Sequence, residues 1–544
     1  MTGKPFQVPQ EPFLIELFHH WRESPQHILI RDRNYEKEAT VSEFLQDILI
    51  QCQFISERLD SEIHSQLQEP THDVFIALLA RPGYEFAVLF FAIYGLGAVA
   101  VPLAPRLFAE EVNSGHIYVS RVNAYVLEPQ PMKETDPQFV LCRDKKKINP
   151  EKGFSLLYTS GTTGLPKSVL YSRRSACIGF KAYADLMGLS SRDTWLHNQP
   201  LHWKRGFDFF LVCIFSGACF ELCNQVYNST WFWWRMRQRG VTIVYMGPML
   251  LDSLVESLKT IQQNWPHMQY EEALNGLQNV RFLGSGLMRV PQSTKDTWRA
   301  LRRGRPLVIL YGTTEVAGLL SMTDWKSNAS VPPDCCGTGV PPLELKVDDN
   351  GEICVRGPQL MKRYISGNPH AMDDAFDGQG FFKTGDFGRI EDGKVFVLGR
   401  RSQDVIRFLG WKIYGPEIED ALCEHPHVSR ALVVGVAEPG VDQRLAALLV
   451  ERLGSPRFCL LDLRRWLAIE RGILAFKLPT LLRTIPEGHP LPVTDSGKPM
   501  KSRISNDFFN EVEVSHGRTE RWDLSAEEPE IGNRPWDWEG GAAA

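Results

Sequence analysis

No two cysteines in this chain have the CxxC spacing, although 11 cysteines are scattered along its 544 residues. Such a low density argues against a disulfide scaffold or a structural zinc site and indicates a reducing compartment. A basic surplus is also lacking, because 60 Lys and Arg stand against 65 Asp and Glu. Nucleic-acid-binding proteins normally carry that surplus, so no nucleic-acid partner is expected and any bound anion must be held by local geometry.

The ends of the sequence show no targeting signal. The N-terminus reads MTGKPFQVPQEPF, without the apolar core of a secretory signal, and the C-terminal GGAAA is not a peroxisomal address. An uncharged run over residues 86–104 is interrupted by Gly95, Gly97 and Pro102, which favours a buried helix, a turn and a strand over a membrane span. We therefore expect a cytoplasmic protein with no transmembrane segment.

Apolar strand-like runs alternate with amphipathic helical stretches through the first two thirds of the chain, which predicts an α/β fold with mostly parallel sheets. We expect a large N-terminal domain of layered α/β sheets over residues 1–402, with a small β subdomain after about Cys335. A smaller, mobile α+β C-terminal domain is expected over residues 403–510. Residues 511–544 are acidic and contain several Trp, which indicates a poorly ordered tail that could dock a Trp on the body.

The segment 154–170 reads FSLLYTSGTTGLPKSVL, an apolar strand that runs into small and hydroxyl residues. Glycines let the backbone approach an oxyanion closely, and successive N–H groups form an anion nest to which hydroxyls and a lysine add donors. Pro166 excludes a Walker A loop, which needs a glycine at that position. The expected phosphate-binding residues are Thr159, Ser160, Gly161, Thr162, Thr163, Gly164 and Lys167.

The TSGTTGLPK loop resembles the signature of the adenylate-forming ANL superfamily, which contains acyl- and aryl-CoA synthetases, peptide-synthetase adenylation domains and luciferases. The resemblance extends over roughly residues 30–505, with Ser168 where relatives usually carry glycine. It implies a ligase of lipid or secondary metabolism that uses ATP, Mg²⁺ and coenzyme A. A small carboxylic acid would first become acyl-AMP with release of pyrophosphate, and a thiol would then take the acyl group.

The resemblance also implies roles for individual residues. Glu315 would bind magnesium, Thr314 would contact phosphate, and Asp386 would bind the ribose hydroxyls. Lys498, in the turn LPVTDSGKPMK, matches the family's acid-activating lysine. The remaining nucleotide-binding residues implied are Tyr311, Gly312 and Thr313.

The junction between the expected domains reads GRRSQDVIRFLGWKI. One residue more than in the family pattern separates Gly399 from Asp404, so either Arg400 or Arg401 can fill the ribose-contacting role. The hinge residue falls within 402–404. Gly410 and Lys412 match the loop that lines the thiol tunnel in relatives.

The acyl pocket of relatives is built from three segments, which here contain His202, Trp203, Met246, Gly247, Gly284 and Gly286. Apolar and glycine residues dominate them, which suits a hydrophobic acid. Leu310 stands where malonate-activating relatives carry Arg, so a small diacid is disfavoured. Asp208 does not match the amine-binding Asp of amino-acid adenylators.

Three alternatives remain open at this stage. The acyl group could pass to a carrier protein instead of coenzyme A. The chain could be an acyl-AMP-dependent oxygenase of the luciferase type, or an inactive nucleotide-binding scaffold. Retention of the loop together with Glu315, Asp386 and Lys498 argues against the scaffold.

Overall fold

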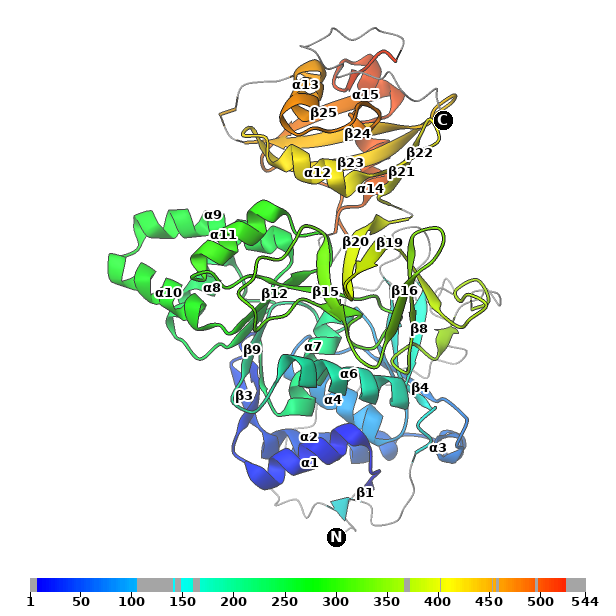
Figure 1. Ribbon diagram of the computed structural model, residues 1–544. Helices are drawn as coiled ribbons and strands as arrows, with labels where there is room; N and C mark the ends of the chain where they lie inside the picture. Colours follow the sequence, from blue (N-terminus) through cyan, green and yellow to red (C-terminus); the bar gives the residue numbers. More distant parts are fainter. Residues whose placement is uncertain are drawn as a thin grey trace.

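The computed structural model describes residues 7–104, 140–141, 148–159, 167–365, 372–401, 403–452, 454–455, 459–494 and 498–524. Two bodies are visible in Figure 1: a large unit that includes every strand up to β20, and a smaller C-terminal unit that begins at β21. Within the described ranges, no helix is long and apolar enough to cross a membrane. The cytoplasmic location stays a prediction.

A five-stranded sheet in the large unit has the order β18-β8-β7-β5-β4. The uncharged run forms the buried helix α4, a turn at Gly97 with a φ of 83°, and the strand β5, as the sequence predicts. β7 and β8 are antiparallel neighbours and pair Tyr158 with Ser168, so the predicted phosphate loop connects them. The strands are β4 (Phe75–Leu78), β5 (Val99–Pro102), β7 (Gly153–Tyr158), β8 (Ser168–Ser172) and β18 (Arg363–Ile365), and α4 spans Tyr84–Gly95.

A second sheet of 13 strands has the order β16-β17-β19-β20-β15-β14-β13-β12-β11-β9-β10-β2-β3. The strands from β13 to β2 are parallel neighbours, which confirms the predicted α/β layering. These strands are β2 (Ile28–Asp32), β9 (Thr194–His197), β10 (Cys219–Leu222), β11 (Ile243–Tyr245), β12 (Phe282–Gly286) and β13 (Val308–Tyr311), and the edge strand β3 is Lys37–Thr40.

From β14 onward, neighbouring strands of this large sheet are antiparallel, and most of them belong to the small β subdomain predicted after about Cys335. They do not form a sheet of their own, because β14 reverses direction after β13 and then pairs with β15, which extends the large sheet. These strands are β14 (Ser321–Met322), β15 (Cys335–Gly339), β16 (Glu344–Val347), β17 (Glu352–Arg356), β19 (Phe382–Glu391) and β20 (Lys394–Arg400).

Helices cover the sheets and supply about half of the apolar core of the large unit. α2 begins with a capping box in which Thr40 and Glu43 satisfy each other's backbone N–H groups, and α7 ends at Gly217 in a left-handed conformation. Besides α4, the principal helices of the large unit are α1 (Pro12–Glu23), α2 (Val41–Ser56), α6 (Arg173–Met187), α7 (Lys204–Ser216), α8 (Ser229–Arg237), α9 (Pro248–Asn264), α10 (His267–Asn279) and α11 (Gln292–Leu301).

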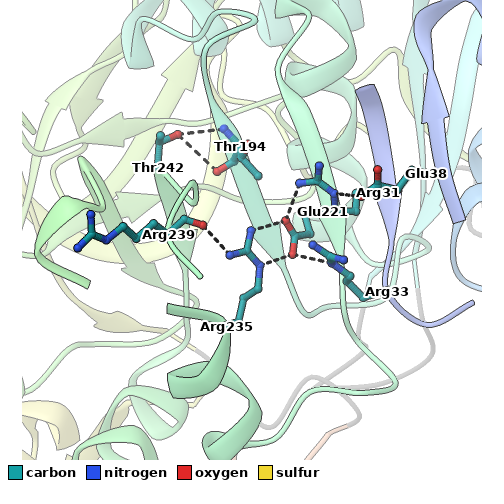
Figure 2. Close-up of polar contacts among 8 residues, drawn as sticks. All are labelled: Arg31, Arg33, Glu38, Thr194, Glu221, Arg235, Arg239 and Thr242. Atoms are coloured by element: carbon teal, nitrogen blue, oxygen red, sulfur yellow. Dashed lines mark hydrogen bonds and ion pairs between the residues drawn. The ribbon is translucent and has the colours of Figure 1, made fainter. Parts of the chain in front are cut away.

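One buried carboxylate connects the N-terminal strand β2 to the body of the large sheet. Glu221 on β10 accepts hydrogen bonds from Arg31 and Arg33, which lie on and directly after β2, and from both Nε and Nη2 of Arg235 on α8 (Figure 2). Glu38 on β3 pairs with the outer side of Arg31. The four hydrogen bonds compensate the burial of the Glu221 charge.

The C-terminal unit has its own six-stranded sheet, covered by helices. The poorly ordered tail expected over residues 511–544 does not begin at residue 511. Residues 511–515 form the helix α15 (Glu511–Ser515), and β26 (Glu520–Arg521) pairs with β25. Trp522 packs beneath Arg464, in line with the expected docking of a Trp. The strands are β21 (Val405–Phe408), β22 (Trp411–Tyr414), β23 (Val428–Glu438), β24 (Asp442–Glu451) and β25 (Leu481–Pro486), with helices α12 (Gly415–Cys423), α13 (Leu460–Glu470) and α14 (Lys501–Phe508).

Candidate active site

The loop after β13 holds Glu315 in a buried position. Its carboxylate accepts hydrogen bonds from the Thr313 hydroxyl and, at 2.8 Å, from the Tyr364 hydroxyl. The carbonyl of Thr314 accepts a hydrogen bond from the Tyr171 hydroxyl at 2.6 Å. Tyr171 and Tyr364 lie on the neighbouring strands β8 and β18, so the five-stranded sheet fixes the orientation of the Thr-Glu pair.

The base of the predicted phosphate loop lies next to this carboxylate. Thr159 N donates to the Lys167 carbonyl at 2.8 Å, and Lys167 N donates to the Thr159 hydroxyl at 3.0 Å, which closes the loop. The Lys167 ammonium lies 5.1 Å from the centre of the Tyr364 ring, the same ring whose hydroxyl binds Glu315. The other predicted loop residues, Ser160, Gly161, Thr162, Thr163 and Gly164, lie outside the described residues.

Asp386 forms the second part of the site, on β19 directly opposite Arg400 on β20. The Tyr311 hydroxyl donates to Asp386 at 2.8 Å, and Arg400 Nε lies 3.8 Å from the other carboxylate oxygen. Burial raises the pKa of Asp386, and the nearby Arg400 and Tyr311 oppose that shift. Gly312 follows Tyr311 and brings the chain past the backbone of Gly318, to which a Cβ would approach within 3.4 Å.

The structure separates the two arginines that the sequence leaves equivalent. The Arg400 side chain faces Asp386, whereas the Arg401 side chain is exposed and its backbone N–H donates to Gly385 at 2.8 Å. Asp386 pairs with Arg400 and Phe387 pairs with Gly399, so the ladder between β19 and β20 places Arg400 directly across from Asp386. Arg400 therefore lies in the position expected of the ribose-contacting residue.

Lys498 reaches the same group from the C-terminal unit. Two hydrogen bonds with Thr494 close the turn that carries it: Lys498 N donates to the Thr494 hydroxyl at 3.1 Å, and Thr494 N donates to the Lys498 carbonyl at 2.8 Å. Burial lowers the pKa of Lys498, the nearby Arg400 lowers it further, and Asp404 and Asp386 oppose the shift. Residues predicted from three separate motifs are thus brought within electrostatic range of one another.

The segment that joins the two units is anchored at Asp404. The Asp404 carboxylate accepts a hydrogen bond from Arg400 N at 2.9 Å. The Lys501 ammonium lies 2.7 Å from Asp404 and 2.7 Å from Glu419 on α12. Burial alone would raise the pKa of Asp404, but Lys501 outweighs it and the pKa is lowered. The Asp404 carboxylate therefore connects the backbone of Arg400, at the end of β20, to Lys501 on α14 of the C-terminal unit.

Gly410 and Lys412 lie in the β21–β22 hairpin. Gly410 has a φ of 82°, and an added Cβ would meet nothing within 4 Å, so the turn is open at this point. Lys412 is exposed, and its ammonium lies 5.9 Å from the centre of the Phe387 ring. The hairpin therefore touches the strand that carries Asp386.

The predicted acyl-pocket residues have unequal surroundings. His202 and Trp203 lie just before α7 with ring centres 6.0 Å apart. Gly247 precedes α9, and an added Cβ would meet only the Leu287 side chain, at 3.8 Å. Met246 is fully buried, and its sulfur accepts a hydrogen bond from Asn198 at 3.4 Å. Trp203 and Gly247 are therefore better placed than Met246 to meet a substrate.

The two predicted glycines of β12 are required by packing. An added Cβ on Gly286 would lie 2.3 Å from the Leu310 carbonyl oxygen, and one on Gly284 would lie 2.8 Å from the Leu310 side chain. Real Cβ atoms do not approach backbone oxygens so closely. These glycines let β12 and β13 lie side by side where the Tyr311 motif begins.

A buried charged cluster on α7 was not identified as functional from the sequence. Lys204 forms an ion pair with Asp208 and donates to the Gly318 carbonyl at 3.2 Å. Burial raises the pKa of Asp208 to about 6, against the opposing effect of Lys204. The i, i+4 spacing of Lys204 and Asp208 was the available signal. No comparable signal pointed to Tyr364, whose importance appears only through the β8–β18 pairing.

Two family models match the chain: the AMP-binding enzyme model over residues 114–365 and the AMP-binding enzyme C-terminal domain model over residues 417–498. The chain is 28% identical over 526 residues to the acyl-CoA ligase oryP of Aspergillus oryzae (strain ATCC 42149 / RIB 40). The matched region covers 92% of this chain and 93% of the relative. It is 26% identical over 493 residues to malonate–CoA ligase of Arabidopsis thaliana, covering 80% and 78% of the two chains.

Among solved structures, ATP-bound MatB from Rhodopseudomonas palustris is similar in fold, with a TM-score of 0.72 at 18% identity over 92% of this chain and 99% of that chain. The chain belongs to the ANL superfamily of adenylate-forming enzymes. The predicted class, an AMP-forming acid–thiol ligase, is thereby confirmed.

Proposed function

We propose that this enzyme converts a small, largely hydrophobic carboxylic acid into its coenzyme A thioester through an acyl-AMP intermediate. The observation that carries the proposal is the convergence of Glu315, the Asp386–Arg400 pair and Lys498 on one site built by both units. The proposed domains are residues 1–402 for adenylation and residues 403–510 for the part that supplies Lys498. Relatives named as CoA ligases support coenzyme A as the acceptor.

In the first half-reaction, a carboxylate oxygen of the acid attacks the α-phosphorus of ATP. The bond to the β-phosphate oxygen breaks, and pyrophosphate leaves with its electron pair. The Asp386 carboxylate accepts hydrogen bonds from the ribose hydroxyls, and Arg400 holds that carboxylate in place. The Lys498 ammonium positions the acid and stabilises the charge that develops on the α-phosphate. The Thr159–Lys167 loop binds the leaving phosphates.

The residues around Glu315 fit a magnesium ion that is held mainly by the nucleotide. No group of three or more His, Cys, Asp or Glu that could hold a metal occurs in the described part of the chain. Mg²⁺ commonly takes only one or two protein carboxylates and completes its shell with phosphate oxygens and water. Glu315 would hold the ion, with Thr314 contacting phosphate beside it. Bound Mg²⁺ supplies positive charge that neutralises the phosphate oxygens.

In the second half-reaction, the thiol sulfur attacks the acyl carbonyl, the thiol proton is lost, and AMP departs. We propose that rotation of the C-terminal unit at residues 402–404 replaces Lys498 by the Gly410–Lys412 hairpin. An open glycine turn leaves room for an extended thiol arm to pass. Transfer to a carrier protein instead of coenzyme A would use the same carbonyl chemistry.

A pyrophosphate-release assay with a panel of acids tests the proposal, and mass spectrometry identifies the thioester. We expect acid- and Mg²⁺-dependent release, and thioester with coenzyme A but not with a phosphopantetheinylated carrier protein. Glu315→Gln should lower the release and raise the Mg²⁺ requirement, whereas the matched change Glu344→Gln, at an exposed position, should have no effect. ATP binding without release for any acid would favour the inactive scaffold.

A further inference from the structure

The first two turns of α7 bury more positive than negative charge. Lys204, Arg205 and Asp208 all lie here, and Asp208 is fully buried while Arg205 is 7% exposed. Cations are disfavoured at a helix N-terminus, where the backbone N–H groups already present positive charge. Asp208 and the buried Glu315 both act on Lys204, whereas burying a cation that has no carboxylate partner of its own is costly.

The two cations are not equally satisfied. Lys204 pairs with Asp208, donates to the Gly318 carbonyl and lies 5.9 Å from the centre of the Tyr171 ring. The Arg205 guanidinium makes a weak hydrogen bond to the Leu310 carbonyl at 3.4 Å and lies 5.5 Å from the centre of the Tyr245 ring. Among the described residues, no carboxylate oxygen lies within the 4.0 Å of an ion pair to Arg205. Arg205 is therefore the cation of this cluster that has no carboxylate partner.

Polar atoms without partners gather around this guanidinium. The Tyr245 hydroxyl, the Tyr183 hydroxyl and one oxygen of Asp208 are buried without a hydrogen-bond partner. Burial raises the pKa of both tyrosines, and the positive charge of Arg205 opposes that shift in each. Native proteins leave few buried polar groups unpaired, and a group of them marks a place where a ligand or water belongs.

This polar group lies beside Gly286 on β12 and Leu310 on β13, at the border of the predicted acyl pocket. A Cβ built on Gly286 would lie 3.2 Å from the Tyr245 hydroxyl and 2.3 Å from the Leu310 carbonyl oxygen, the oxygen that Arg205 also contacts. Leu310 directly precedes Tyr311, whose hydroxyl binds Asp386. The segments involved are those that the sequence assigns to the acyl pocket.

We propose that Arg205 and the Tyr245 hydroxyl bind a second carboxylate on the acid substrate, so that the enzyme prefers dicarboxylic acids whose spacer carries the apolar part. The inference rests on the proposed function, because it concerns the acid that is adenylated. A carboxylate matches both the positive charge of Arg205, which has no ion-pair partner in the part of the chain that the structure describes, and the planar, two-pronged donor geometry of its guanidinium. Malonate-activating relatives carry an arginine at the position of Leu310. In this chain the guanidinium of Arg205, on α7, lies against the Leu310 carbonyl instead.

Matched pairs of monoacid and diacid test the inference: butyrate with succinate, hexanoate with adipate, octanoate with suberate, and benzoate with terephthalate. We expect the diacid of at least one pair to have a kcat/KM for pyrophosphate release about 10- to 100-fold above its monoacid partner, as for one charge-assisted contact. Arg205→Met should abolish or invert that preference, and Arg205→Lys should retain part of it.

Tyr245→Phe provides a readout that a structural role would not move. Because the hydroxyl has no partner in the free enzyme, its removal should leave the thermal midpoint unchanged or raised. The KM for the preferred diacid should nevertheless rise several-fold, while the Kd for ATP stays constant. The exposed Lys181→Met, on α6, serves as the charge-removal control.

The possible failures are distinguishable. If neither member of any pair supports pyrophosphate release, the proposed function itself fails. If monoacids are preferred throughout and Arg205→Met leaves that preference unchanged, the acid–ligase activity stands and the second-carboxylate inference is overturned. A Tyr245→Phe variant with unchanged KM for every acid would also contradict it.

Discussion

The Tyr311 hydroxyl donates a hydrogen bond to Asp386 at 2.8 Å and so connects the end of β13 to β19, two strands that are not neighbours in the large sheet. Each residue belongs to a separate sequence motif. The contact places the carboxylate proposed to bind the ribose beside the loop that carries Glu315. It also leaves the Asp386 carboxylate facing a guanidinium on its other side.

Tyr311→Phe should weaken nucleotide binding without unfolding the protein. The variant removes one hydrogen bond to a carboxylate, which is worth about 1.5–3 kcal/mol, so the Kd for ATP should rise by roughly tenfold or more. Isothermal titration with ATP in the absence of acid measures this directly. Asp386→Asn, which keeps the shape but removes the charge, should weaken binding further, and equal affinity in all three proteins would refute the ribose assignment.

Lys498→Ala should cripple the first half-reaction alone. Removing one preorganised donor commonly costs about 10²–10³-fold in rate, so acid-dependent pyrophosphate release should fall by that amount. The same variant should form thioester from pre-made acyl-AMP and coenzyme A at a near-normal rate. If both half-reactions fall together, Lys498 has a structural role or the two-orientation mechanism is wrong for this chain.

The pH dependence of the first half-reaction should reflect the buried Lys498. Burial lowers its pKa below the ordinary 10.5, and the cation is the active form, so the rate should fall as pH rises through that lowered pKa. Lys498→Arg keeps the charge to much higher pH because a guanidinium does not lose its proton in this range. The alkaline limb of the release profile should therefore shift upward in the variant, and an unshifted limb would assign it to another group.

Gly247→Leu and Gly286→Ala should affect the enzyme in opposite ways. Space exists beside Gly247, so Gly247→Leu should lose long or bulky acids selectively, in a graded manner of about 1–3 kcal/mol per methylene. Gly286→Ala forces a Cβ against the Leu310 carbonyl and should lower the thermal midpoint, with an overpacking cost of about 1–3 kcal/mol. Kinetics across an acid series and thermal unfolding of both variants separate the two effects. Uniform loss over all acids in Gly247→Leu would place the acyl pocket elsewhere.

Glu221→Gln should destabilise the large unit strongly. Burial alone would raise the Glu221 pKa, but Arg235 and Arg33 outweigh it and lower the pKa, so this stabilisation is present at neutral pH and is lost as pH falls through the lowered pKa. Leaving arginines without their buried carboxylate costs about 3–5 kcal/mol. The control Glu38→Gln changes an exposed partner of Arg31 and should cost at most about 1 kcal/mol. Denaturant unfolding at pH 7 and at acid pH should show the difference shrinking as pH falls.

Much of the fold could be predicted because the relevant patterns are local. The uncharged run became α4, a glycine turn and β5, since Gly97 and Pro102 punctuate it. The joining of β14 to β15 into one sheet of 13 strands could not be predicted, because strand pairing depends on contacts between distant segments. The ordered segment 511–524 was missed for the same reason: its short strand is stabilised by β25, not by its own acidic sequence.

The candidate site was likewise predictable where a local motif exists and not where contacts between distant segments decide. The motifs single out Glu315, Asp386 and Lys498, and the structure brings them within electrostatic range of Arg400, while their roles stay predictions. The choice between Arg400 and Arg401 depended on the pairing of Arg400 with Asp386 across β19 and β20, which no sequence pattern shows. Tyr364 was missed altogether, because a tyrosine on an edge strand has no motif of its own.

The pairing of β2 with β10 also sets an order of events during synthesis. Arg31 and Glu221 meet although 190 residues separate them in the chain. On a ribosome that adds roughly 5–20 residues per second, β10 is therefore synthesised on the order of 10–40 s after β2. During that interval Leu29 and Ile30, fully buried in the finished protein, lack the neighbour that covers this edge of β2. The charged arginines beside them keep this early strand from pairing with other chains until β10 emerges.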